Sequence, residues 1–225
     1  MKKIVIIPAY NEQGSILNTI EDIRKNAPDF DYVVINDCSK DDTLKLCRKN
    51  GIRVLDLPIN LGIGGAVQTG YLYAYRNNYD LAVQFDGDGQ HDAKFLDIMA
   101  ETLEKENLDM VIGSRFINNQ GFQSSAVRRF GIRFLRILFG QNITDATSGM
   151  RMCNRKVMEF FIKDYPKDYP EPETVARLLR HKCKVKEIPV IMRERQAGVS
   201  SISSLRKSAY YMCKVSLAIL IERLR

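Results

Sequence analysis

The chain has 225 residues, 45% of them hydrophobic, and a formal net charge of +7. This length can bury a substantial core and fits one large domain with a smaller appendage. The five cysteines are scattered without a C-x-x-C pair, which excludes a disulfide framework or zinc knuckle and indicates reduced thiols on the cytosolic side. The N-terminal apolar run stops at Pro8, so it is too short for an export signal and predicts a strand.

The positive charge is concentrated in two segments. Residues 125–139 contain four arginines and no acid, and residues 193–225 contain seven Lys or Arg against two Glu, so they contribute +4 and +5. The rest of the chain is therefore slightly acidic. Such clustering indicates contact with a polyanion such as nucleic acid, anionic lipid or phosphate groups. A solvated helix face is the alternative, and it explains the C-terminal charges more readily than the acid-free arginine cluster.

Short apolar runs alternate with amphipathic segments along the first half of the chain. The runs predict strands at residues 2–7, 32–35, 52–57, 81–85 and 110–113. The segments between them predict helices at 14–27 and 92–106, a helix capped by residues 41–43 that closes at 51, and a helix that the loop 60–66 opens and that reaches about 78. This alternation is typical of βαβ units around a mainly parallel sheet, in which ligands bind at the carboxyl ends of the strands. The candidate residues at those ends are Tyr10, Glu12, Asp37, Asp86, Asp88 and Arg115.

The acidic stretch after the fourth predicted strand is the strongest candidate site. Asp86 and Asp88 are two residues apart, so their side chains share a face of an extended segment. Two close carboxylates repel each other unless a cation lies between them, which predicts Mg²⁺ or Mn²⁺ bound together with a diphosphate. A simple Asx/Gly turn is the alternative. A calcium loop is excluded because His91 and Asp97 occupy the positions that require Gly and Glu.

The glycine-rich loop at residues 62–65 does not match the known nucleotide-binding motifs. Val67 replaces the third glycine of the dinucleotide fingerprint, and the loop follows the third predicted strand instead of the first. No G-x-x-x-x-G-K-[ST] motif occurs either, which excludes a P-loop. This loop is interpreted either as the tightly packed start of a helix or as a segment near the ligand, with equal weight.

Six motifs occur in an order that resembles one enzyme family. They are P-A-Y-N-E at 8–12, N-D-C-S-x-D-D-T at 36–43, N-L-G-x-G-x-A at 60–66, D-G-D-G-Q-H at 86–91, G-S-R-F at 113–116 and D-A-T-S-G-M-R at 145–151. Together they resemble family 2 glycosyltransferases, especially the polyprenyl-phosphate hexosyltransferases such as dolichyl-phosphate mannose synthase and bacterial undecaprenyl-phosphate sugar transferases. The resemblance implies an α/β GT-A domain over residues 1–201, with helices flanking a mainly parallel sheet.

The resemblance also implies roles for individual residues. The expected donor-binding residues are Pro8, Tyr10, Glu12, Asp37, Asp86, Gly87, Arg115 and Arg195. The expected metal ligands are Asp86, Asp88 and Gln90, the expected catalytic residues are Asp88, Arg115 and Asp145, and the acceptor phosphate is expected at Arg128, Arg129, Ser148 and Arg151. The loop at 195–201 resembles the family's R-x-x-G-x-S-K, but Ser201 replaces the lysine, with Arg193 or Lys207 as candidate substitutes.

The expected chemistry is displacement of a nucleoside diphosphate from a sugar. A divalent cation and arginines would stabilise the charge on the leaving group, and attack from the opposite face would invert the anomeric centre. A phosphate acceptor, with a second pKa of about 6, is already largely dianionic and needs positioning more than a base. Arg129, Arg133 and Arg136 fall on one helical face beside apolar residues, which suits a lipid phosphate. The alternative is an amphipathic core helix with solvated arginines.

Residues 202–225 are expected to form a basic amphipathic helix. Their apolar stretch at 210–221 is shorter than the roughly 20 residues that span a bilayer, so an interfacial helix on an anionic membrane surface is expected. Packing on the domain, on a small membrane-protein partner or on a second copy is the alternative. These features predict a peripheral protein at the inner face of the cell membrane, without a nucleic-acid partner.

Three functions follow from these patterns. The leading hypothesis is an inverting, metal-dependent transfer of a hexose of the Glc or GlcNAc type from a UDP-sugar, with GDP-mannose as the less favoured donor. The acceptor would be undecaprenyl or another polyprenyl phosphate, for cell-wall or surface polysaccharide synthesis. In the second hypothesis the acceptor is a saccharide hydroxyl and Asp145 or Glu173 is the base. The third is a non-catalytic module that binds nucleotide sugar or anionic lipid. His91 is interpreted as loop packing and His181 as a surface residue.

Overall fold

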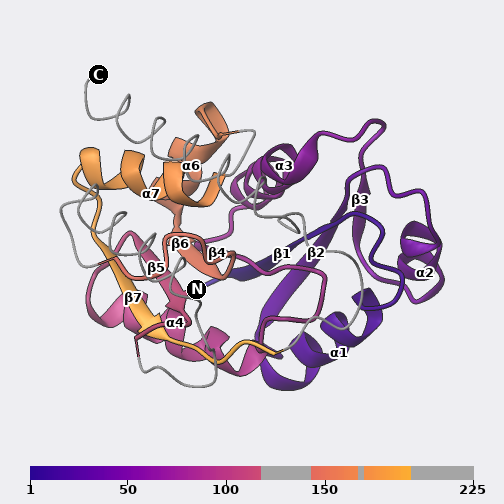
Figure 1. Ribbon diagram of the computed structural model, residues 1–225, viewed down its shortest axis with the longest axis horizontal. Coiled ribbons are helices and arrows are strands. Elements are labelled where there is room, and N and C mark those ends of the chain that lie inside the picture. Colours follow the sequence, from indigo (N-terminus) through magenta and orange to yellow (C-terminus); the bar gives the residue numbers. More distant parts are fainter. Residues whose placement is uncertain (118–142, 167–169, 194–225) are drawn as a thin grey trace, which may run out of the picture.

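The computed structural model describes residues 1–117, 143–166 and 170–193, in which seven strands form one sheet (Figure 1). The strand order is β3-β2-β1-β4-β6-β5-β7. The strands are β1 (Lys3–Ala9), β2 (Phe30–Asn36), β3 (Val54–Asp56), β4 (Leu81–Gln84), β5 (Met110–Ser114), β6 (Arg151–Asn154) and β7 (Val185–Pro189). Only β6 is reversed, because it pairs antiparallel with both β4 and β5.

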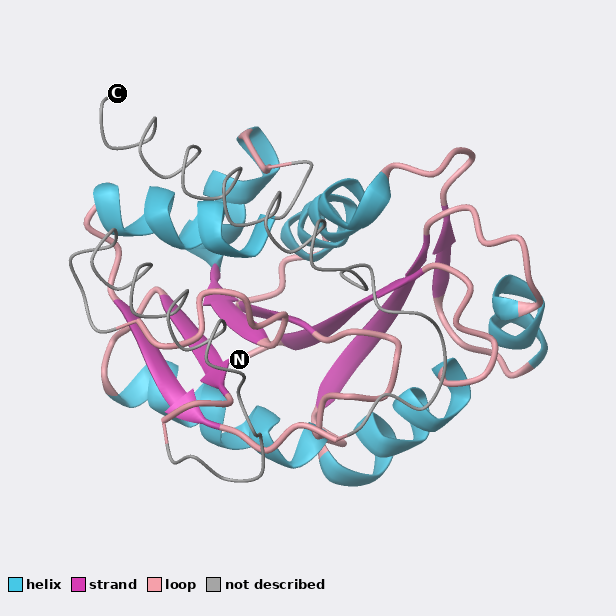
Figure 2. Cartoon of the chain, viewed as in Figure 1, coloured by secondary structure: helices cyan, strands magenta, loops and turns pink. Residues whose placement is uncertain are grey.

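Helices cover both faces of the sheet (Figures 1 and 2). They are α1 (Ile16–Asn26), α2 (Thr43–Lys49), α3 (Gly62–Arg76), α4 (Leu96–Lys105), α6 (Arg155–Lys163) and α7 (Pro170–Arg180), with a short 3₁₀ turn at Ala93–Phe95. Helices α3, α6 and α7 pack on one face, and α1 and α4 pack on the other. Alternate residues of β1 therefore enter different cores, since Ile4 faces the first and Val5 the second. Burial on both faces is typical of parallel strands.

The predicted alternation of strands and helices is confirmed, with small shifts at the element ends. The third strand is shorter than expected, and the fourth helix begins only after the 3₁₀ turn. The reversed strand β6 and the edge strand β7 were not predicted. Their sequences, RMCN and VKEIP, carry charged residues within the strands, so neither reads as an apolar run. Both segments are strands in the folded chain because they pair with β5.

Several sequence expectations lie outside the described residues. These are the arginine cluster with Arg128 and Arg129, the loop containing Arg195 and the helix expected at 202–225. The boundary between a domain of residues 1–201 and a C-terminal helix therefore stays a prediction. Within the described ranges, every helix is too short or too polar to cross a membrane.

Gly70 lets α3 approach β1 closely. A Cβ atom at this position would lie 2.1 Å from Cγ2 of Ile6, so Gly70→Ala must push the helix away from the sheet. We expect this overpacking to lower the free energy of unfolding by about 1–3 kcal/mol, which outweighs the roughly 1 kcal/mol of helix propensity that alanine adds. Urea unfolding measures the change.

Arg76→Ala is the control for Gly70→Ala, because Arg76 is exposed in the last turn of the same helix. It should alter the free energy of unfolding by no more than about 0.5 kcal/mol. A Gly70→Ala protein as stable as the wild type would show that the α3–β1 contact is looser than described.

Candidate active site

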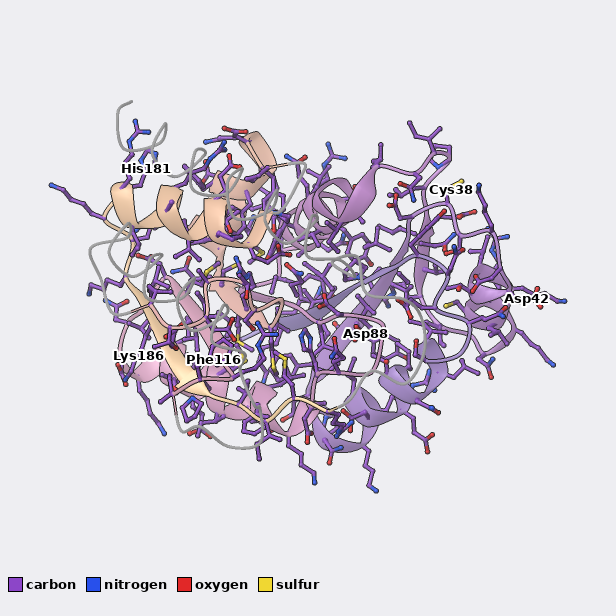
Figure 3. All side chains as sticks on the ribbon, viewed as in Figure 1. Cys38, Asp42, Asp88, Phe116, His181 and Lys186 are labelled. Carbon is purple, nitrogen blue, oxygen red and sulfur yellow. The ribbon has the colours of Figure 1, made fainter. Side chains whose placement is uncertain are left out.

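The sequence-predicted residues come together at one edge of the sheet. Parallel strands β1, β2, β4 and β5 end at this edge, and the reversed strand β6 begins there, since Arg151 pairs with Gln84. The segments that follow the parallel strands and the loop that precedes β6 therefore meet. Figure 3 shows Asp88 near the middle of the molecule, away from His181 and Lys186 at its periphery.

The loops after β1 and β2 are tied to each other. The backbone N–H of Asn11 donates to Oγ of Ser39 (3.0 Å), and the Asn11 side chain accepts from the N–H of Lys40 (2.8 Å). Asn11 has φ 58°, a left-handed conformation that asparagine tolerates well. The preceding residue, Tyr10, leaves 43% of its surface exposed, so its ring is available to a ligand at this edge.

Glu12 and Pro8 frame the same loop from inside. The N–H of Glu12 donates to Oγ1 of Thr43 (2.9 Å), and its carboxylate accepts from Oγ of Ser15 (2.8 Å). Pro8 is buried, and its carbonyl oxygen would lie 3.2 Å from a Cβ added to Gly87. The first loop and the acidic turn after β4 are thus in close contact.

Asp37 connects β2 to the glycine-rich loop. One of its carboxylate oxygens accepts from the N–H of Leu61 (2.6 Å), and its carbonyl oxygen accepts from the side chain of Asn60 (3.0 Å). Only 3% of Asp37 is exposed. The start of α3 therefore lies beside a predicted donor-binding residue. The loop is also tightly packed, because a Cβ on Gly65 would meet Leu61.

A buried histidine orients the acidic turn. The N–H of Asp86 donates to Nδ1 of His91 (3.0 Å), while Nε2 of His91 lies 3.6 Å from Oδ2 of Asp86. Because Nδ1 accepts, we assign the proton of the neutral ring to Nε2, facing the carboxylate. Burial lowers the pKa of His91. The ring also meets Phe85 edge-on, so the sequence interpretation of His91 as loop packing covered only part of its role.

Two further contacts fix the Asp86 carboxylate. Nε2 of Gln84 donates to Oδ1 of Asp86 (3.3 Å). On the other side, a Cβ added to Gly149 would lie only 2.5 Å from Oδ2 of Asp86. The carboxylate therefore rests against the backbone of the loop that precedes β6, and the strand order is what brings these two segments together.

The acidic turn carries oxygen-bearing side chains of the types that bind a divalent cation. Asp88 is 3% exposed, and its Oδ1 accepts from the N–H of Gln90 (3.0 Å). Within the described part of the chain, no three His, Cys, Asp or Glu side chains gather as a metal-binding group. Mg²⁺ commonly binds proteins through one or two carboxylates and completes its shell with water and substrate phosphates. Asp86 and Asp88 carry carboxylate oxygens and Gln90 carries an amide oxygen, which are ligand types of this kind.

Arg115 and Asp145 form a buried, bidentate ion pair. Nε and an amino nitrogen of Arg115 donate to the two oxygens of Asp145, both at 2.7 Å. The backbone N–H of Arg115 also donates to Asp145 (3.2 Å), and the guanidinium reaches Oγ1 of Thr147 (3.0 Å). The Asp145 side chain is fully buried, whereas 20% of the Arg115 side chain is exposed. The plane of the guanidinium is therefore fixed at the edge of the site.

Glu187 of β7 holds the backbone behind this ion pair. Its carboxylate accepts from the N–H and the hydroxyl of Thr144, both at 2.7 Å, and from the N–H of Asp145 (2.6 Å). Thr144 also contacts the Ser114 hydroxyl (2.6 Å). Burial raises the pKa of Glu187, and the three hydrogen bonds oppose that shift. Sequence reasoning missed this residue because an acid within a strand looks like an ordinary solvent-facing position.

Arg151 and Ser148 support the loop that precedes β6. Arg151 is fully buried and donates to the carbonyls of Ala146, Ser148 and Glu171 and to the hydroxyl of Thr174. Ser148 is also buried, and its hydroxyl accepts from the N–H of Met150 (3.2 Å). These contacts favour a structural role. Contact between Arg151 and an acceptor phosphate would require exchange of these bonds.

Two other candidate residues are engaged in ion pairs. Glu173 accepts from Arg177 one helical turn later (2.6 Å). Arg193 forms ion pairs with Asp22 (3.1 Å) and Asp92 (2.9 Å). Arg193 is thereby held beside the acidic turn, and these pairs would have to open for it to replace the family's missing lysine.

Comparison with known proteins shows the family of this chain. The sequence profile of "Glycosyl transferase family 2" matches residues 4–161. An uncharacterised protein of Methanocaldococcus jannaschii is 31% identical over 83% of this chain and 79% of its own length. The undecaprenyl-phosphate mannosyltransferase of Micrococcus luteus is 29% identical, over 90% of this chain and 88% of its own.

A solved structure shares the architecture. Glucosyl-3-phosphoglycerate synthase from Mycobacterium tuberculosis, crystallised with Mn²⁺, UDP and phosphoglyceric acid, superimposes with a TM-score of 0.75. The match covers 98% of this chain and 78% of that one at 18% sequence identity, so it shows the fold alone. The expected GT-A fold is confirmed. The chain belongs to glycosyl transferase family 2 and is a glycosyltransferase.

Proposed function

We propose that this glycosyltransferase moves a hexose from a nucleotide sugar to a polyprenyl phosphate, with inversion at the anomeric carbon. The observation that carries the proposal is the meeting of the Asp86–Asp88 turn with the Arg115–Asp145 ion pair at one edge of the sheet. Carboxylates that suit a cation and a fixed guanidinium suit a diphosphate leaving group. The name of the Micrococcus luteus relative supports the lipid-phosphate acceptor.

We propose a UDP-sugar of the Glc or GlcNAc type as the donor. The Mycobacterium tuberculosis synthase that shares the fold was crystallised with UDP, which supports UDP as the nucleotide. The Micrococcus luteus relative is named as a mannosyltransferase, so GDP-mannose belongs in any donor panel. We propose that Asp37 contacts the base and that Tyr10, whose surface is 43% exposed, contacts the nucleoside.

The proposed cofactor is Mg²⁺ or Mn²⁺. Asp86, Asp88 and Gln90 would hold the ion, which when bound supplies positive charge for the diphosphate. His91 and Gln84 keep the Asp86 carboxylate in a fixed orientation, so the turn does not have to reorganise on binding. Charged groups that are already oriented before the substrate binds contribute most to electrostatic catalysis.

Arg115 is proposed to bind a phosphate of the donor, with Asp145 as its positioning partner. Both oxygens of Asp145 already accept from Arg115 and the side chain is fully buried. Asp145 is therefore poorly placed to remove a proton from an acceptor. A phosphate monoester, with a second pKa of about 6, needs no such base. This favours a phosphate acceptor over a saccharide hydroxyl.

A polyprenyl acceptor places the reaction at a membrane surface. We propose that the protein binds the inner face of the cell membrane peripherally. The support is the sequence charge of the two basic segments, residues 125–139 and 193–225, which contribute +4 and +5. Juxtamembrane basic clusters bind anionic lipid by electrostatic attraction.

Asp88→Asn tests the metal-dependent proposal. The change keeps the side-chain volume but removes the charge, so we expect kcat/KM for transfer to undecaprenyl phosphate to fall on the order of 100-fold or more. The assay combines Mg²⁺ or Mn²⁺, a panel of labelled nucleotide sugars and the lipid phosphate, and it measures butanol-extractable label. Asp97→Asn, an exposed carboxylate in α4, should retain wild-type activity. Full activity of Asp88→Asn would refute the proposed metal site.

Asp145→Asn separates the two acceptor classes. For a phosphate acceptor we expect weakened but measurable transfer, about 10–100-fold down, because the Arg115 contact is damaged while no base is lost. For a hydroxyl acceptor that uses Asp145 as base, turnover should disappear. Parallel assays with water-soluble oligosaccharides identify the second case, since label would then remain in the aqueous phase.

His91→Phe tests the orientation of the acidic turn. Phenylalanine keeps the ring contact with Phe85 but leaves the buried N–H of Asp86 without its acceptor, which should cost about 1–3 kcal/mol of unfolding free energy. Mn²⁺-dependent binding of UDP should weaken as well. His181→Phe is the matched control, because His181 is exposed, and it should change stability by no more than about 0.5 kcal/mol. Equal effects of the two changes would contradict the role given to His91.

A further inference from the structure

We propose that Glu187 is a positioning residue for phosphate binding, because it fixes the Thr144–Asp145 backbone that holds Arg115 in place. The inference rests on the proposed function for the identity of the ligand. Whatever the ligand, the carboxylate of Glu187 in β7 controls the orientation of the Arg115 guanidinium at the edge of the site.

Glu187 uses both carboxylate oxygens on a single stretch of backbone. One oxygen accepts from the N–H and the hydroxyl of Thr144, and the other accepts from the N–H of Asp145. All three distances lie between 2.6 and 2.7 Å, in the range of charge-assisted hydrogen bonds. Two successive backbone N–H groups are thereby held by one side chain, so this segment has little freedom to rotate.

The backbone that Glu187 holds in turn positions Arg115. Asp145 accepts from Nε, an amino nitrogen and the backbone N–H of Arg115. The position of the Asp145 carboxylate follows from its backbone, which Glu187 holds. A bidentate contact fixes both the position and the plane of a guanidinium. A small rotation of the 144–145 segment would therefore tilt the Arg115 side chain at the point where a phosphate is expected.

The location of Glu187 makes this role specific. In β7 it pairs with Ile112 of β5, whereas Arg115 directly follows β5 and Asp145 lies in the loop before β6. The Glu187 side chain thus connects β7 to the loop before β6, beside the end of β5. Asp86 and Asp88 belong to the turn after β4, whereas the Glu187 carboxylate is engaged by Thr144 and Asp145, so its role differs from that of the proposed cation ligands.

Glu187→Gln is the informative substitution. Glutamine has the same shape but presents an NH₂ group to at least one donor, so at least one of the three hydrogen bonds becomes a donor–donor contact. We expect the Kd for UDP in the presence of Mn²⁺ and the KM for the donor to rise about tenfold, the size expected for one hydrogen bond to a charged group. Glu159→Gln, an exposed acid in α6 that pairs with Lys163, is the control and should leave both constants unchanged.

A double-mutant cycle separates positioning from general destabilisation. If Glu187 acts through Arg115, Glu187→Gln should have no further effect on donor KM in an Arg115→Ala background. A merely structural role predicts that the two effects multiply. Glu187→Asp retains the charge and should recover part of the wild-type KM. Independent effects of Glu187 and Arg115, or full affinity in Glu187→Gln, would overturn the inference.

An NMR measurement tests the contact without relying on transfer. The Nε–H resonance of Arg115, identified by its loss in Arg115→Lys, should exchange slowly with solvent in the wild type and faster in Glu187→Gln. Faster exchange together with no transfer by the wild type would refute the proposed function and leave the positioning role standing. Transfer by the wild type with unchanged exchange in Glu187→Gln would refute the positioning role alone.

Discussion

The reversed direction of β6 is the constraint on which the candidate site depends. Parallel strands deliver the acidic turn and Arg115 to one edge, but only a reversed strand between β4 and β5 brings its preceding loop to that same edge. That loop carries Asp145, which holds Arg115, and Gly149, which lies against Asp86. Because one antiparallel strand is inserted, the acidic turn, Arg115 and the loop before β6 lie at the same edge of the sheet, where their opposite charges are close together.

The cost of burying charge explains why each buried carboxylate of the site has its particular partners. Buried carboxylates are costly unless they accept hydrogen bonds or face a cation. Asp145 meets this requirement with Arg115, and Glu187 meets it with backbone and hydroxyl donors. In the acidic turn, Asp88 accepts from the N–H of Gln90, and Nε2 of His91 lies 3.6 Å from the Asp86 carboxylate. A guanidinium already paired with a carboxylate keeps its orientation but carries less net positive charge toward a phosphate, so the proposed cation and Arg115 would share the task of neutralising the leaving group.

The sequence was sufficient for the alternating part of the fold and for the acidic turn, because apolar runs and closely spaced aspartates carry local signals. It also indicated the motif at 145–151, but only through resemblance. It did not reveal that Arg151 is enclosed by carbonyls or that Glu187 reaches the 144–145 backbone. Both facts depend on strands that pair across long sequence separations, and a charged residue within such a strand gives no periodic signal. His91 was identified only as packing because its partner is a backbone N–H.

The close approach of Gly149 to Asp86 restricts which residue can occupy position 149. With only a hydrogen where other residues carry a side chain, the loop before β6 rests directly on a carboxylate of the β4 turn. A Cβ atom at position 149 would lie 2.5 Å from Oδ2 of Asp86, so any larger residue would displace either this carboxylate or the loop. The close approach of the acidic turn and the loop before β6 therefore requires glycine at this position.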